Sequence, residues 1–283
     1  MIDLHTHTNE SDGTYSPFEL VDAAVEAGLE ALAISDHDTL AGYDQALPRA
    51  REKGLDLVCG IELSTKLRGK TVHLLGYFLH EPPADGFRGW LKEMQATRRD
   101  RNLRMAERLR SLGVNVTIEE VERRGRSLAG RPHFARIMLE KGYVSTIQQA
   151  FDDYLDESAK GYVDRHEPEL AYGIRKIADA GGISSIAHPV RLGYHDPQRL
   201  RATVAEMRDA GLSALEVYHS DHRPADVEQY LALTREFELG MTGGSDFHGD
   251  AKPNVRLGRG VDGNLNIPRS VLDRMRKIRP RVS

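Results

Sequence analysis

The chain has 283 residues, of which 40% are hydrophobic, so it can bury a sizeable core and neither a disordered nor a fibrous protein is expected. Its 43 acidic and 39 basic residues give a formal net charge of −4, which excludes a general attraction to nucleic acid or anionic lipid. No stretch approaches roughly 18 uncharged apolar residues, MIDLHTH does not resemble a signal peptide, and Cys59 is the single cysteine. These features favour a soluble, cytoplasmic protein with Cys59 in its core.

The first quarter of the sequence alternates short apolar runs with helical patterns. Strands are expected at MIDLH, EALAISDHD, LDLVCGIEL and TVHLLGYFL, and helices over SPFELVDAAVEAGL and in a stretch that ends at Lys53. The first helix has the clearest signals, with Ser16 as N-cap, Pro17 at the first helical position, Glu19 completing a capping box and Gly28 as the stop. This alternation is typical of an α/β protein with a largely parallel barrel or sheet.

Residues 81–165 interrupt the alternation. This segment begins with the charged stretch LKEMQATRRDRNLRMAERLRSLG and shows helical patterns without convincing strands. Strands are expected again at GGISSIAHP, SALEVYH and LGMTGGSDFH, each after a helical segment. We therefore expect residues 1–80 and 166–283 to form one discontinuous seven-stranded barrel, with residues 81–165 as an inserted helical domain that caps it.

Histidines and carboxylates recur at the ends of the predicted strands. They are His5, His7, Asp12, Asp36, His37, Glu62, His73, His188, Asp246 and His248. In a parallel barrel these strand ends meet at one face, where such barrels build their sites. Each residue alone has an ordinary explanation, since Asp36 could cap a helix, Asp246 could close a turn and Glu62 could be solvated. Their coincidence favours a metal site, because the same charges buried together without cations would repel one another.

Mixed imidazole and carboxylate ligands suit Zn²⁺, Mn²⁺ or Fe²⁺. The candidate ligands are more numerous than one ion can use, so we expect two or three divalent metal ions. The spacing does not choose among the three metals.

The motifs DLHTHTNESDGTYSP, ISDHD, GIE, VHLLGY, IAHP and GGSDFH resemble those of the polymerase and histidinol phosphatase (PHP) family, in the family's order. The resemblance covers essentially the whole chain and implies a distorted (β/α)7 barrel similar to a TIM barrel. Within residues 81–165, the stretches RRDRNLRM, AGRPHFAR and QAFDDYL are similar to the branch that dephosphorylates nucleoside 3',5'-bisphosphates and trims short RNA from its 5' end. Lys160, in SAKGYV, departs from the pattern of that branch.

The resemblance implies three ion sites. The first would use His5, His7, Glu62 and Asp246, the second Glu62 as a bridge with His73 and His188, and the third Asp12, His37 and His248. A water shared by two cations would lose its proton near neutral pH, and the hydroxide would attack phosphorus in line. Asp36 would orient a ligand histidine. His219, which ends EVYH, would contact substrate or protonate the leaving oxygen, unless it is an ordinary strand-end histidine.

Substrate phosphate held away from the metals is expected to contact arginine, whose planar fork binds two oxygens at once. The candidates are Arg101 with Asn102, Arg131 with His133, and Arg191. Most arginines in the helix around Arg101 are expected to face solvent, and Arg191 could instead pair with a surface carboxylate. His80, His166, His195 and His222 are expected on the surface.

The leading prediction is a phosphomonoesterase that acts on nucleoside 3',5'-bisphosphates and on short 5'-phosphorylated RNA, without a membrane or an obligate protein partner. A histidinol-phosphate-type phosphatase is the nearest alternative with the same chemistry. A metal-dependent amidohydrolase is a second alternative, although a carboxylated lysine has no clear counterpart in this sequence. A non-catalytic metal-binding or polymerase-accessory module is the third, and the intact ligand set speaks against it.

Overall fold

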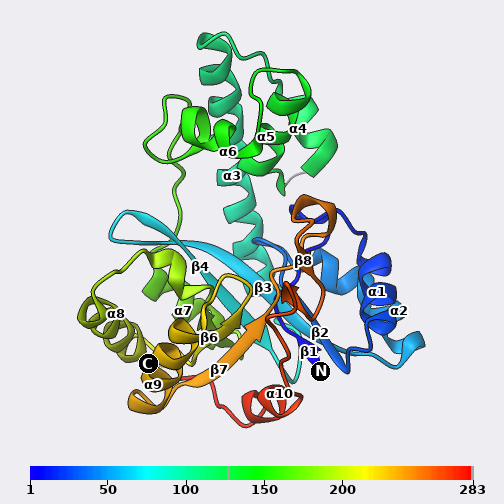
Figure 1. Cartoon of the computed structure of the whole chain (residues 1–283), viewed down its shortest axis with the longest axis vertical. Coiled ribbons are helices and arrows are strands. Elements are labelled where there is room, and N and C mark those ends of the chain that lie inside the picture. The colour runs from blue at the N-terminus through cyan, green and yellow to red at the C-terminus, as the bar shows by residue number, and fades with distance from the viewer. Residues whose placement is uncertain (126–127, 282–283) are drawn as a thin grey trace.

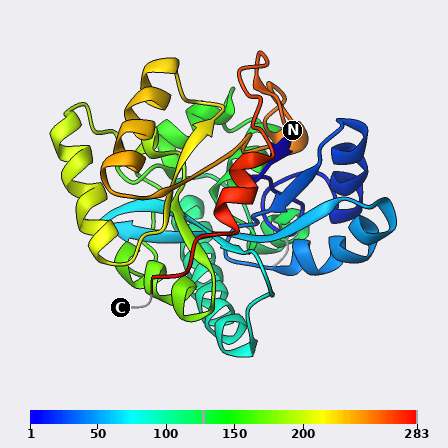
Figure 2. The ribbon, with the colours of Figure 1, turned by 90° about the horizontal axis from the view of Figure 1, so that it is seen from below.

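The computed structural model describes residues 1–125 and 128–281, which form a barrel crowned by helices (Figure 1). Seven strands follow one another around the sheet in chain order. They are β1 (Ile2–Asp3), β2 (Ala31–Ile34), β3 (Asp56–Leu67), β4 (Lys70–Phe78), β5 (Ile183–Ile186), β6 (Ala214–His219) and β7 (Gly240–Gly244). The two edges of the sheet meet where the Leu4 N–H donates to the Gly243 carbonyl at 3.2 Å. The expected α/β fold with a nearly closed seven-stranded barrel is therefore confirmed (Figure 2).

Closure of the barrel depends on a residue without a side chain at the end of β7. A Cβ atom on Gly244 would lie 2.2 Å from the backbone nitrogen of His5, which no packing adjustment could accommodate. The parallel bridge between Thr6 and Phe247 continues this contact beyond the strands. The residues after β1 and those after β7 are consequently brought side by side.

β4 departs from the parallel arrangement expected for most of the sheet, because it runs antiparallel to both β3 and β5. Arg68 and Gly69 connect β3 to β4 with φ values of 51° and 79°, the two-residue turn whose twist suits a hairpin. His73 is therefore near the start of its strand, paired with Ser64 of β3. It still reaches the barrel mouth, by which we mean the end of the barrel at which the parallel strands finish and β4 begins.

Helices surround the barrel (Figure 2). They are α1 (Pro17–Glu26), α2 (Ala41–Lys53), α7 (Leu170–Asp179), α8 (Pro197–Asp209), α9 (Pro224–Glu236) and α10 (Ser270–Met275), and β8 (Val255–Arg256) pairs with β9 (Gly260–Val261) in a separate hairpin. The predicted start of α1 is confirmed, since Ser16 and Glu19 form both hydrogen bonds of a capping box. Cys59 is buried in the core, as expected.

The segment between β4 and α7 is helical. It contains α3 (Asp85–Ser111), α4 (Ile118–Gly125), α5 (Arg131–Glu140), α6 (Ile147–Ala150) and the π-helical turn η2 (Phe151–Leu155). These helices share a hydrophobic cluster that includes Met105 and Phe134, whereas Phe87 and Met94 at the start of α3 pack in the barrel core. The core thus changes partway along α3, and the limits 81–165 for the insertion stay a prediction. Within the described ranges, no helix is both long and apolar enough to cross a bilayer.

Candidate functional site

Glu62 lies in the middle of β3 and is surrounded by imidazoles. His5 Nε2, His73 Nδ1 and His188 Nε2 lie 3.4, 3.1 and 3.0 Å from its Oε1, and His7 Nε2 and His37 Nδ1 both lie 3.2 Å from its Oε2. The Glu62 side chain is only 1% exposed. Since each oxygen faces a different set of nitrogens, this carboxylate can bridge two cations.

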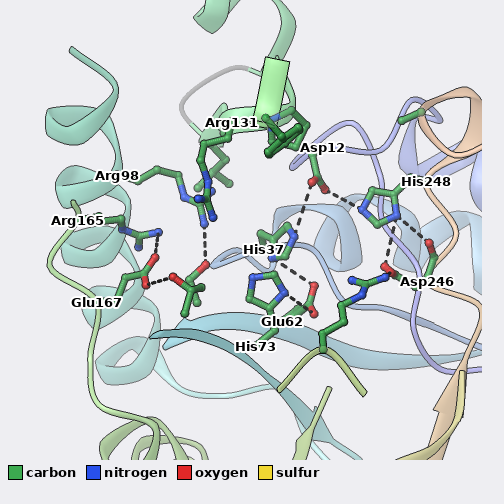
Figure 3. A pocket seen from close by; sticks show the side chains of 18 of the residues that line it. Asp12, His37, Glu62, His73, Arg98, Arg131, Arg165, Glu167, Asp246 and His248 are labelled. Carbon is green, nitrogen blue, oxygen red and sulfur yellow. Dashed lines mark hydrogen bonds and ion pairs between the residues drawn. The ribbon is translucent and has the colours of Figure 1, made fainter. Parts of the chain in front are cut away.

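A second group of ligand-type side chains lies beside Glu62, where the loops after β1 and β7 meet. Asp12 Oδ1 is 3.2 Å from His248 Nε2, and Asp12 Oδ2 is 3.7 Å from His37 Nε2 (Figure 3). The nine predicted ligands fall, together with His219, into four overlapping groups whose donor atoms lie within 4.8 Å of one another. These groups are His7, Asp12, His37 and His248; His5, His219 and Asp246; His5, Glu62 and His188; and His37, Glu62 and His73. The grouping keeps Asp12, His37 and His248 together as expected. It differs from the three expected sets in that His7 joins them, His37 also lies with Glu62 and His73, and His219 lies with His5 and Asp246.

The donor atoms fit divalent cations. His5 Nε2, His7 Nε2, His37 Nδ1 and His73 Nδ1 are buried and have no hydrogen-bond partner among the described residues. His5 donates its other ring proton to Glu216 Oε1 at 2.8 Å, so the lone pair of its Nε2 points toward Glu62. His248 likewise donates from Nδ1 to the Asp246 carbonyl at 2.8 Å. Unpartnered buried nitrogens are costly, and converging lone pairs of this kind accept a cation.

The pKa shifts within the group differ from one side chain to the next, and burial lowers the pKa of His37 to about 3. Burial lowers the pKa of His7, but Asp246 and Glu62 outweigh burial and raise this pKa to about 9. Burial similarly opposes the charge on Glu62, yet His73, His37 and His5 hold its pKa well below the usual range. The carboxylate is thus ionised at neutral pH while His7 retains a proton that a bound cation would displace.

Glu216 in β6 is a site residue that the sequence analysis missed. It is fully buried, and while Oε1 accepts from His5, Oε2 accepts the backbone N–H of His188 at 2.6 Å. It therefore orients one imidazole and fixes the chain at a second. The available signal was a lone carboxylate inside the apolar run SALEVYH, which is unusual for a buried strand.

Asp36 lies at the mouth, but its hydrogen bonds run to the loop after β1 instead of to an imidazole. It accepts from the Thr8 N–H and the Thr8 hydroxyl, both at 2.7 Å, and from Ser11 Oγ at 2.6 Å. Ser11 Oγ is in turn 3.5 Å from His7 Nδ1. Asp36 thus reaches His7 by a hydrogen-bonded path through Ser11 and by direct electrostatic attraction, and not by a hydrogen bond to the ring.

His219 ends β6 with its Nε2 3.4 Å from Asp246 Oδ2. The Asp221 N–H donates to His219 Nδ1 at 3.0 Å, so the neutral ring carries its proton on Nε2, directed toward the site. In this form His219 offers a hydrogen-bond donor to the site.

The surface position predicted for His222 is wrong, because the turn after β6 folds it inward, where it donates to the Val217 carbonyl at 2.8 Å. His80, His166 and His195 are exposed, as expected.

A cavity of about 470 Å³ lies over the mouth, between the barrel and the insertion (Figure 3). Its barrel side includes Asp12, His37, Glu62, His73, Asp246 and His248, and its insertion side includes Arg98, Arg101, Arg131, Leu128, Pro132, Ile147 and Phe151. Arg101 is 5% exposed, and no carboxylate of the described residues forms an ion pair with it. Burial, with Arg98 and Arg131 nearby, lowers the pKa of Arg101 to about 9. Glu167, which lines the same cavity, only partly offsets this effect, and guanidinium charge without an ion-pair partner is suited to an anionic ligand.

Arg98 and Arg165 join the insertion to the barrel and were not predicted as site residues. Both donate to Asp38, Arg98 at 2.5 Å and Arg165 at 3.1 Å. Arg98 and Arg101 are buried, whereas Arg99, Arg104, Arg108 and Arg110 are exposed, so most arginines of this helix face solvent as expected. The exposed arginines are on the other side of α3, where Arg104 pairs with Asp100. Arg98 and Arg101 are buried because they lie on the face of α3 that turns toward the barrel mouth.

The remaining predicted substrate contacts differ in position. Arg131 lines the cavity and donates to the Leu155 carbonyl at 3.3 Å, at the end of η2. Arg191 also lines it and pairs with Asp221 and Asp246. Asn102 is buried and donates to the Ala129 carbonyl at 2.6 Å, which holds the chain before α5. His133 accepts the Gly130 N–H at 3.1 Å and packs against Gly125.

Backbone strain is concentrated at the mouth. Three of the six non-glycine residues with positive φ in the described ranges are Asp38 (54°), His188 (29°) and Asp246 (59°). Such conformations cost free energy and occur where the surroundings require a particular side-chain direction. Here they direct two candidate ligands and the carboxylate that anchors the insertion.

Comparisons with known proteins agree with this geometry. Residues 3–165 match the PHP domain model. The chain is 34% identical over 264 residues to the 5'-3' exoribonuclease Rnm of Salmonella typhimurium (91% of this chain, 88% of the relative) and 29% identical over 265 residues to the 3',5'-nucleoside bisphosphate phosphatase of Chromobacterium violaceum (92% of each). A crystal structure from Bifidobacterium adolescentis, described as a metal-dependent phosphoesterase, superposes with a TM-score of 0.81 at 34% identity and covers 96% of both chains. This chain belongs to the PHP family of phosphoesterases.

Proposed function

We propose that the chain removes the 3'-phosphate from nucleoside 3',5'-bisphosphates and, by the same reaction, trims short 5'-phosphorylated RNA to nucleoside 5'-monophosphates. The observation that carries this proposal is the presence of two separate anion-binding groups in one cavity. The carboxylates and imidazoles around Glu62 form one, through the cations they fit, and Arg101 with Arg131 forms the other. The named activities of the relatives, exoribonuclease and bisphosphate phosphatase, support it.

The metal centre in this proposal uses the nine predicted ligands. Glu62 would be shared between ions, with His5 and His188 on one side and His37 and His73 on the other. His7, Asp12 and His248 would hold a further ion together with His37, and Asp246 would contribute beside His5. Two or three Mn²⁺, Fe²⁺ or Zn²⁺ ions would neutralise phosphoryl oxygens and make water more acidic at this place. Glu216 would keep the His5 ring in the orientation that binding requires.

Arg101 and Arg131 would bind the 5'-phosphate, the group that does not react. A buried guanidinium without a carboxylate is unfavourable in the free protein and is compensated when a phosphate arrives. Leu128, Ile147 and Phe151 add an apolar surface on the same side of the cavity, which suits a nucleoside. A histidinol-phosphate-type substrate has a single phosphate and would leave Arg101 uncompensated, so the geometry favours the bisphosphate.

RNA that begins with a 5'-phosphate presents the same two groups, its 5'-phosphate and the first phosphodiester. In both substrates a water oxygen bonds to phosphorus and the bond from phosphorus to O3' breaks, with a proton delivered to O3'. The bisphosphate then yields inorganic phosphate, and the RNA yields a shortened chain whose new 5' end is phosphorylated. His219 would donate the proton, because its Nε2–H faces the site.

The test compares substrates on metal-replete protein. Adenosine 3',5'-bisphosphate should be hydrolysed to adenosine 5'-monophosphate far faster than p-nitrophenyl phosphate or histidinol phosphate, and a chelator should abolish the activity. RNA with a 5'-phosphate should be trimmed in preference to the same RNA with a 5'-hydroxyl. Equal, slow turnover of all phosphate esters, or release of adenosine 3'-monophosphate, would contradict the proposal. Hydrolysis of an amide panel would favour the amidohydrolase alternative.

A further inference from the structure

Asp246 turns its two oxygens toward different kinds of neighbour. Oδ1 faces the candidate ligands His5, His7 and His248 at 3.5, 3.4 and 3.4 Å. Oδ2 lies 2.6 Å from Lys252 Nζ, 3.1 Å from Arg191 Nη2 and 3.4 Å from His219 Nε2. Oδ1 thus lies among the candidate metal ligands, while Oδ2 lies near two cationic side chains and a ring N–H from three separate segments of the chain.

The two cations at Oδ2 differ in how far their charge is compensated. Arg191 also binds Asp221, through Nε at 3.0 Å and Nη2 at 2.6 Å, and so has a carboxylate of its own. Asp246 is the one carboxylate among the described residues that pairs with Lys252. If Asp246 also serves divalent cations, Lys252 lies next to them with little negative charge left to it. An excess of positive charge at one place is favourable only when an anion binds there.

The chain around Lys252 is held firmly. The Thr14 N–H donates to the His248 carbonyl at 3.1 Å, and the Asp250 N–H donates to Thr14 Oγ1 at 2.8 Å. Gly249, with φ of 62°, approaches Thr14 so closely that a Cβ there would lie 2.2 Å from Oγ1. The Lys252 side chain is 33% exposed and lines the cavity beside Asp12 and His248. The backbone at Lys252 is therefore held in place, while its side chain remains accessible to a ligand in the cavity.

We propose that Lys252, together with Arg191, binds the non-bridging oxygens of the phosphoryl group that reacts, as distinct from the second phosphate at Arg101. An ammonium group has three protons in a compact charge, so it can keep Asp246 as one partner and take a phosphoryl oxygen as another. The inference rests on phosphoester hydrolysis at this mouth and does not depend on the substrate being a nucleotide. It adds a substrate-binding residue that neither the strand-end pattern nor the ligand groups contain.

The experiment titrates inorganic phosphate into metal-loaded protein by calorimetry and measures bound metal by elemental analysis. The variants are Lys252→Met, Lys252→Arg and, as a matched control, Lys277→Met, which changes an exposed lysine after α10. Because phosphate can also bind at Arg101, each titration is repeated in an Arg101→Met background. Lys252→Met should weaken phosphate binding by about tenfold or more at unchanged metal content, Lys252→Arg should retain part of it, and Lys277→Met should match the parent.

Two results would overturn the inference. The first is unchanged phosphate affinity in Lys252→Met. The second is a loss of phosphate binding that follows a loss of metal, which would mean that Lys252 acts on the metal ligands through Asp246. Failure of the nucleotide proposal is recognised separately, since a protein that ignores bisphosphates can still show phosphate binding that depends on Lys252.

Discussion

The charge of Arg101 is expected to lower the free energy of unfolding of the free protein, and a bound phosphate is expected to offset this loss. It is buried in the cavity without an ion-pair partner among the described residues. Replacing it with methionine keeps the length and apolar contacts of the side chain and removes the charge. The change is therefore expected to stabilise the free protein and to impair the hydrolysis of bisphosphates.

The magnitude follows from the pKa of Arg101, which burial and the neighbouring arginines lower to about 9. At about 1.36 kcal/mol per pKa unit, a fall from an ordinary value of about 12.5 corresponds to roughly 5 kcal/mol of disfavoured charge. Because the lowered pKa belongs to a base, the cost is fully present below about pH 9, declines as the pH rises above that value, and is absent only above the ordinary pKa of about 12.5. Water and buffer anions in the cavity offset part of it, so we expect a gain of about 1–3 kcal/mol in the free energy of unfolding for Arg101→Met.

The assay is chemical unfolding in buffer free of phosphate, with Arg104→Met as the control on the exposed side of α3. Added phosphate should stabilise the parent more than Arg101→Met. For adenosine 3',5'-bisphosphate, kcat/KM should fall by about 10- to 150-fold, the loss expected for a charged hydrogen bond of about 1.5–3 kcal/mol, while p-nitrophenyl phosphate should be little affected. An Arg101→Met protein that is less stable without phosphate and hydrolyses the bisphosphate normally would refute the reasoning.

Three further predictions concern the metal centre and the cavity. Affinity for Mn²⁺ or Zn²⁺ should rise by about tenfold per pH unit for each proton displaced up to about pH 9, because His7 stays protonated below its pKa; calorimetry that finds a flat profile would contradict this. Glu216→Gln should weaken metal binding by about 10- to 100-fold with the fold intact by circular dichroism, and an unchanged metal content would exclude its role at His5. Phe151→Ala should raise KM several-fold for nucleoside bisphosphates alone, and an equal effect on p-nitrophenyl phosphate would argue against an apolar nucleoside contact.

The strand-end residues could be predicted because their position along the chain also fixes their position in space. His5 and Asp246 come just after their strands, and parallel strands of one barrel finish at the same face. Glu62 lies within β3 but is bridged to His37 just beyond the end of β2, which places it at the same level. The α1 start was equally accessible, since a capping box involves only neighbouring residues. The strand ends and the helix start are both recognised from neighbouring residues alone, whatever the arrangement of the remaining chain.

Other features depend on contacts that no local pattern records. The reversal of β4 depends on a hairpin at Arg68 and Gly69, and the burial of His222 depends on how the turn after β6 folds back. Lys252 looks like an ordinary surface lysine in the sequence, and only its ion pair with Asp246 shows that it lies at the site. Arg98 resembles the solvated arginines around it until Asp38, sixty residues earlier, is seen to accept its charge.

The reversal of β4 also bears on how the insertion is supported. Phe78, at the end of β4, pairs with Cys59 near the start of β3, so the chain leaves the sheet at the end of the barrel away from the ligands. It returns through α3, whose 27 residues span about 40 Å at about 1.5 Å per residue (Figure 1). This single helix packs in the barrel core through Phe87 and in the core of the insertion through Met105. It thus sets the distance between the guanidinium groups of the insertion and the carboxylates of the barrel mouth. Shortening or kinking this helix would change that distance, without replacing a residue of either set.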